Sequence, residues 1–149
     1  MALIALNSVS PHGSCARPGV ARRPVRLSAA RRRQGRILTG AGLVLLPWLG
    51  YLAGTLPPAE AAAWVTLDTL EAACLLTAGT RLLRGEPSHR AAAAAAALLL
   101  TADACIDLAT AAPGAELATA IAMAVGAELP LAGLCMVLAT RRGATERDH

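Results

Sequence analysis

The chain has 149 residues, of which 55% are hydrophobic, and its mean hydropathy is +0.50. Soluble domains of this size are less apolar, so the composition excludes an ordinary soluble fold and indicates an integral membrane protein in contact with a lipid bilayer. The formal net charge is +4, and all 14 basic residues are arginines. These lie outside or at the ends of the apolar segments, so anionic lipid headgroups explain them better than a nucleic acid does.

The first 36 residues contain eight arginines, three prolines and no acidic residue. This composition is typical of a disordered basic arm, so we predict that residues 1–36 are disordered and cytoplasmic. Cleavage as a signal peptide is not expected, because the short run MALIAL has no charged residue before it. The composition also leaves open an organelle transit peptide or a misassigned start codon.

Four apolar segments follow, each close to the roughly 20 residues that cross a bilayer core. They cover residues 37–56, 60–83, 91–112 and 115–139. Prolines and glycines lie between them, where helices should end. Short links favour antiparallel neighbours, so the sequence predicts an all-α, up-down, four-helix transmembrane bundle within residues 37–142, followed by a cytoplasmic tail at 143–149.

Arginine placement predicts the orientation of this bundle. Arginines occur in the arm, in the link between the second and third segments and in the tail, whereas the links TLPPAE and AAPGAE have none. The positive-inside rule therefore places both termini in the cytoplasm, with the protein in the plasma (cytoplasmic) membrane. Trp48, Tyr51 and Trp64 fall toward the outer ends of their segments, as expected for aromatic residues at a membrane interface.

Cysteines and glycines give weaker signals. Cys15, Cys74, Cys105 and Cys135 are scattered singly, without a spacing suited to zinc, and are best interpreted as small packing residues. Gly50 and Gly54 have the GxxxG spacing of close helix contacts, but in a chain so rich in Ala and Gly general packing is the better interpretation.

Acidic residues inside the apolar segments carry the most informative chemistry. They are Asp68 and Glu71 in the second segment, Asp103 and Asp107 in the third, and Glu128 in the fourth. Each acid at the centre of a helix costs roughly 2.5–3.5 kcal/mol on insertion, whereas a Leu or Val returns only about 0.3–0.6 kcal/mol. We therefore expect these acids to face a bundle interior rather than lipid.

The spacing of the acids predicts a shared polar interior. Asp68 and Glu71 lie on one helical face, as do Asp103 and Asp107, so the helices can bring all five carboxyl groups to a cavity that opens outward near Asp107. Burial and mutual repulsion disfavour five ionised carboxylates, so they must share protons or bind a cation of unspecified identity.

Two prolines each leave a main-chain carbonyl oxygen without its helical hydrogen-bond donor. Pro130 lacks an N–H and frees the carbonyl of Gly126, close to Glu128, which gives oxygen ligands suited to hard cations. Pro47 frees the carbonyl of Leu43 in the first segment and, like Pro130, is a candidate helix kink.

The alternative interpretation is structural. Protonated Asp and Glu can hold helices together through hydrogen bonds worth about 0.6 kcal/mol each, without any ligand. Glu60 and Glu116 lie at the outer boundary and are interpreted as solvated helix caps.

Three segments, AAWVTLD (62–68), TADACIDLAT (101–110) and GAELPLAGL (126–134), resemble a group of small, uncharacterised four-helix integral membrane proteins of actinobacteria. The resemblance covers roughly residues 37–142 and implies a membrane protein without assigning an activity. It singles out Trp64, Asp68, Asp103, Asp107, Glu128 and Pro130. Cys105 and Ile106 depart from the pattern, because bulky aromatic residues are expected there.

Two functions remain open at this point. The first is a membrane protein that binds or passes protons or a cation through the five acids. The second is an accessory subunit that stabilises a membrane-protein partner, or pairs with its own copies, through its helix faces. An enzyme ranks third, because no nucleophile–base pair or phosphate loop is evident, so no catalytic residue and no cofactor is predicted.

Overall fold

The computed structural model describes residues 28–141. Residues 1–27 and 142–149 lie outside this range. The predictions for most of the basic arm, for Cys15 and for the C-terminal tail therefore fall outside the described residues.

All regular structure in residues 28–141 is helical. The elements are α1 (Ala29–Thr55), α2 (Pro58–Arg84), α3 (His89–Thr110), α4 (Ala115–Met123), the π-helical turn η1 (Ala124–Glu128) and α5 (Leu129–Thr140). The last three follow one another without a break and form one long helix. Residues 28–141 thus contain four helices that are each long and apolar enough to cross a membrane, in the places where the sequence predicts them.

The first helix begins earlier than the sequence predicts. Residues 29–36 belong to α1, so the predicted disordered arm is wrong for this part of the chain. Ser28 caps the helix, because its hydroxyl oxygen accepts a hydrogen bond from the Arg31 backbone N–H at 3.3 Å. Ala and Arg, which dominate the first turns, are among the strongest helix formers. The helix therefore extends beyond the apolar stretch.

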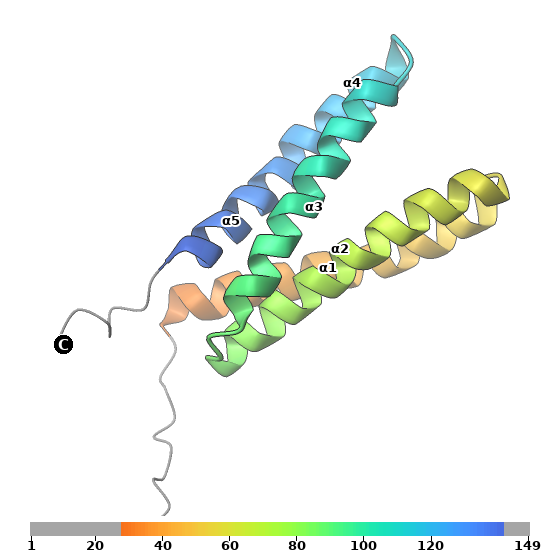
Figure 1. Ribbon diagram of the computed structural model, residues 1–149. Coiled ribbons are helices and arrows are strands. Elements are labelled where there is room, and N and C mark those ends of the chain that lie inside the picture. The colour runs from red at the N-terminus through yellow and green to blue at the C-terminus, as the bar shows by residue number, and fades with distance from the viewer. Residues whose placement is uncertain (1–27, 142–149) are drawn as a thin grey trace, which may run out of the picture.

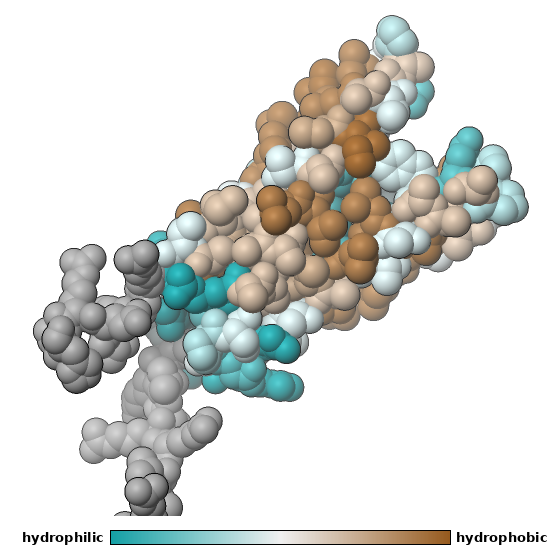
Figure 2. Space-filling model, in the orientation of Figure 1, coloured by the Kyte–Doolittle hydropathy of each residue, from teal (hydrophilic) through white to brown (hydrophobic). Residues whose placement is uncertain are grey.

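Figure 1 shows the four long helices arranged as a V, with α1 and α2 in one arm and α3 with α4–η1–α5 in the other. The arms meet through α2 and α3. The described chain starts and ends at the closed end of the V, beside the α2–α3 link, whereas the other two links lie at the tips. Hydrophilic surface gathers at the closed end and at the tips, with apolar surface between them, and a cleft opens between the arms (Figure 2).

The closed half of the V holds an apolar core. Its buried members come from all four long helices and are mostly leucine and alanine. They are Leu38, Leu75, Ala78, Leu82, Ala93, Ala96, Ala97, Leu100, Ala132, Cys135 and Leu138. Alanine lets the helix backbones approach closely, so this half of the molecule is densely packed.

A glycine seam, made of Gly35, Gly42 and Gly79, joins α1 to α2. A Cβ on Gly79 would lie 2.8 Å from the carbonyl oxygen of Gly35 and 2.8 Å from the backbone nitrogen of Thr39, so no larger side chain fits. Gly50 and Gly54 instead have open space around them. The predicted GxxxG pair therefore makes no close helix contact among the described residues.

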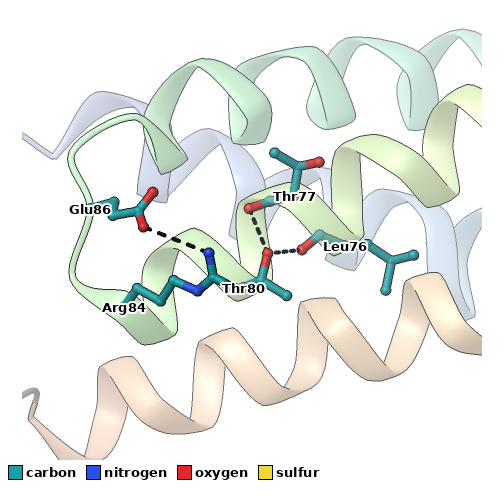
Figure 3. Close-up of polar contacts among 5 residues, drawn as sticks. All are labelled: Leu76, Thr77, Thr80, Arg84 and Glu86. Carbon is teal, nitrogen blue, oxygen red and sulfur yellow. Dashed lines mark hydrogen bonds and ion pairs between the residues drawn. The ribbon is translucent and has the colours of Figure 1, made fainter.

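Polar contacts gather near the α2–α3 link. The Arg90 Nε–H donates to the carbonyl oxygen of Ala139 at 2.9 Å, which ties the start of α3 to the end of α5. An Arg84 guanidinium nitrogen lies 3.9 Å from a Glu86 carboxylate oxygen, and the Thr80 hydroxyl donates to the Leu76 carbonyl oxygen at 2.7 Å (Figure 3). Thr80 thereby satisfies its polar group within its own helix, as hydroxyl residues in apolar helices do.

Candidate functional site

The structure brings together all five acidic residues singled out by the sequence. Asp68 and Glu71 come from α2, Asp103 and Asp107 from α3, and Glu128 from the end of η1. They form two overlapping groups in which one oxygen atom from each residue lies within 4.8 Å of the others. The groups are Asp68, Glu71 and Asp103, and Asp103, Asp107 and Glu128. We call these the inner triad and the outer triad, and the five residues together the acidic cluster.

Burial differs between the members of the acidic cluster. Four of the side chains are buried, with Glu71 only 2% exposed and Glu128 7% exposed. Asp107, which is closest to the α3–α4 link, is only partly buried. The acids therefore face the interior of the helix assembly, as the insertion costs predict, and Asp107 is the most accessible of them.

The π-helical turn positions Glu128. The Leu129 backbone N–H donates to the carbonyl oxygen of Ala124, five residues back, instead of the usual four. Ala120, Ala124, Glu128 and Ala132 are all buried at a constant spacing of four residues. That spacing drifts by about 40° per step around a regular α-helix, and the wider turn absorbs part of the drift. Such turns occur frequently at functional sites.

Pro130 and the π-helical turn together release main-chain oxygens. Pro130 has no N–H, so the Gly126 carbonyl lacks its α-helical donor, as the sequence predicts. The structure adds a second case, because the Leu129 N–H turns to Ala124 and leaves the Val125 carbonyl without the donor four residues ahead. The predicted freeing of carbonyls near Glu128 thus extends to a second one. In α1, the helix runs continuously through Pro47.

Two carboxylate oxygens in the acidic cluster are buried and have no hydrogen-bond partner in the part of the chain that the structure describes. They are Oε1 of Glu71, in the inner triad, and Oε2 of Glu128, in the outer triad. Within residues 28–141, none of the five carboxylates forms an ion pair with an arginine or a histidine. Buried polar atoms are normally paired, so these two oxygens point to an unfilled bonding capacity.

Trp48 contributes a polar group that the sequence analysis missed. The structure places its indole near the Asp68 carboxylate. The ring also stacks on Tyr51, with 5.4 Å between ring centroids. Trp48, Tyr51 and Trp64 all lie in the halves of α1 and α2 nearest the tips, and their interfacial role stays a prediction. No spacing rule links Trp48 to Asp68, because the contact is between helices.

The remaining candidates lie apart from the acidic cluster. Cys135 is fully buried in the apolar core, Cys74 packs against that core, and Cys105 is exposed; all three are free thiols. Cys135 therefore fills the predicted packing role. Glu60 and Glu116 are exposed in the first turns of α2 and α4, where their charges favour the helix N-termini.

Comparison with protein-family models, curated proteins and solved structures finds no match for this chain.

Proposed function

We propose that the chain is a multi-pass membrane protein whose acidic cluster binds or passes protons or a cation. One observation carries the proposal: five carboxyl groups from three successive helices converge, and within residues 28–141 they have no basic partner and two of their buried oxygens have no hydrogen-bond partner. Desolvation and mutual repulsion make such a set costly unless positive charge accompanies it. Intramembrane acids of this kind are typical of ion and proton pathways.

The proposal includes an antiparallel, up-down bundle in the cytoplasmic membrane with both termini on the cytoplasmic side. The arginine-free links support it, because Figure 1 shows both at the tips of the V, opposite the ends of the described chain. In this orientation the cleft between the arms opens to the outside. Asp107 then lies nearest the entrance, and Glu71 is deepest in burial.

Reconstitution into liposomes tests the proposal. The double variant Asp103→Asn, Glu128→Gln removes one acid shared by both triads and one outer acid. Movement of protons or of a divalent cation should fall at least tenfold in this variant. The matched control Glu60→Gln, Glu116→Gln also removes two acids, but from exposed sites outside the acidic cluster, and should keep the parental flux.

Circular dichroism and size-exclusion profiles establish that both double variants are folded. Absence of proton and cation movement in the parent protein, or equal flux in the parent and the cluster variant, would rule out transport through these acids.

A specific observation also favours the second function, an accessory subunit. Gly50 and Gly54 lie on α1 with open space around them, next to exposed apolar residues such as Leu46. This face has room for a helix of a partner or of a second copy. Replacing both glycines with leucine should then abolish a stoichiometric co-purification from native membrane, while the same change at Gly126 and Gly133, which also have open space, should not.

We also propose that the chain belongs with the uncharacterised actinobacterial four-helix membrane proteins that it resembles. The residues that support this include Trp64, Asp68, Asp103, Glu128 and Pro130, four of which lie in or next to the acidic cluster.

A further inference from the structure

The acidic cluster has an internal arrangement that a general proton or cation site does not require. The inner triad and the outer triad share a single residue, Asp103. The remaining acids divide between the triads: Asp68 and Glu71 belong only to the inner one, and Asp107 and Glu128 only to the outer one. The five carboxylates therefore form two adjoining groups rather than one.

Each group has the dimensions of a hard-cation site. Carboxylate oxygens bind Mg²⁺, Mn²⁺ or Ca²⁺ at about 2.0–2.6 Å, so two ligands on opposite sides of one ion lie about 4–5 Å apart. The ligand atoms of each triad lie within 4.8 Å of one another. Three oxygen atoms from three residues can therefore reach a common ion in each triad, with water completing its coordination.

The unpartnered oxygens are divided in the same way. Glu71, whose Oε1 is unpartnered within residues 28–141, belongs to the inner triad, and Glu128, whose Oε2 is unpartnered there, belongs to the outer triad; each of these residues is more than nine-tenths buried. One ion shared by the whole cluster would satisfy a single group of ligands. One unpartnered oxygen in each triad indicates one ligand in each.

Charge favours divalent ions. Two divalent cations offset four of the five negative charges of the acidic cluster, whereas one monovalent cation leaves four uncompensated. Asp103 then lies between the two ions, as bridging carboxylates do in two-metal sites. Sulfur and imidazole ligands are absent from both triads, which disfavours soft metals.

We propose that the acidic cluster is a two-ion site for hard divalent cations, in which Asp103 bridges an inner ion held by Asp68 and Glu71 and an outer ion held by Asp107 and Glu128. This inference rests on the proposed function and specifies its ligand. Asp107, as the most accessible of the acids, is where an ion enters. An ion that moves from the outer to the inner position then keeps a carboxylate ligand throughout, because Asp103 belongs to both triads.

Titration with Mn²⁺ tests the two-ion site, because its electron paramagnetic resonance distinguishes free, bound and spin-coupled ions. The full chain in lipid nanodiscs, stripped of metal with a chelator, should bind two Mn²⁺ per chain with a coupled spectrum. Glu71→Gln should retain one ion in the outer triad, and Glu128→Gln one ion in the inner triad; neither should show coupling. Asp103→Asn should weaken both bindings at least tenfold.

Asp103→Glu and Asp107→Asn guard against misfolding as the explanation. The first keeps a bridging carboxylate and should keep two bound ions. The second changes only the most accessible acid and should lose the outer ion alone. Glu60→Gln, outside the acidic cluster, should bind two ions like the parent.

One bound Mn²⁺ in the parent, weakened equally by Glu71→Gln and Glu128→Gln, would overturn the two-ion site in favour of a single site and leave the proposed function standing. No bound Mn²⁺ together with proton flux in liposomes would overturn the two-ion site but support a proton pathway. No binding and no flux would overturn both proposals.

Discussion

The closed half of the V and the acidic cluster beside it differ in polarity, the first being apolar and the second acidic, although α2 and α3 contribute to both. In the closed half, α2 and α3 contribute Leu75, Leu82, Ala93 and Leu100 to a core without a buried acid among its members. Toward the tips of the V, the same two helices contribute four of the five acids of the acidic cluster. Packing of the apolar core therefore holds the helices together. Its favourable free energy offsets the unfavourable free energy of bringing the acids close to one another.

Removing a core leucine should produce the largest effect on stability. Leu75 is fully buried, so Leu75→Ala leaves a cavity and should lower the free energy of unfolding by about 2–5 kcal/mol. The matched control is Leu70→Ala on the same helix, because the Leu70 side chain is 50% exposed. Thermal denaturation in detergent should separate the two variants clearly. Equal loss in both would contradict a core confined to the closed half.

The glycine seam should be the next most sensitive. Gly79→Ala introduces a Cβ in contact with the α1 backbone, so the helices must separate, at a cost of about 1–3 kcal/mol. Gly50→Ala introduces the same group into open space and should be neutral or slightly stabilising, by up to about 1 kcal/mol. The same denaturation assay compares them, and an equally destabilised Gly50→Ala would show that α1 has another buried contact.

The acidic cluster should respond in the opposite direction. In chelator at neutral pH, Glu71→Gln removes one buried carboxylate from a set of like charges, so it should leave stability unchanged or raise it by about 1 kcal/mol. Added Mn²⁺ should raise the melting temperature of the parent more than that of the variant, because ligand binding to the folded state stabilises it. A large loss of stability in chelator would mean that Glu71 acts as structural glue.

Apolar segment lengths and the prolines between them were sufficient to predict the four long helices. The start of α1 at Ala29 was missed, because hydropathy marks the part of a helix suited to lipid and not the whole helix. For residues 31–36, helix propensity and the Ser28 cap decide the structure. These local signals were present in the sequence but were outweighed there by the charge of the segment.

The site was predictable in its members but not in its arrangement. Insertion costs identify the acids as facing inward, and helical spacing pairs them within each helix. The place of Asp103 in both triads and the approach of Trp48 to Asp68 depend on which helices pack together and at what depth. Packing also explains why Gly35 and Gly79 make close helix contacts whereas Gly50 and Gly54 do not, because a glycine makes such a contact only where another helix lies opposite it.

The π-helical turn makes the position of Glu128 depend on the number of residues in its helix as well as on their identity. Because the Leu129 N–H bonds five residues back, η1 holds a residue more than a regular turn would. Deleting Ala127 would restore a regular helix and leave the segments on either side in nearly the same rotational register, because the wide turn already accommodates one extra residue. A single-residue deletion between Ala120 and Ala124, where no wide turn absorbs the change, would instead rotate one segment by about 100° relative to the other and separate Glu128 from Ala120, with which it shares a buried face.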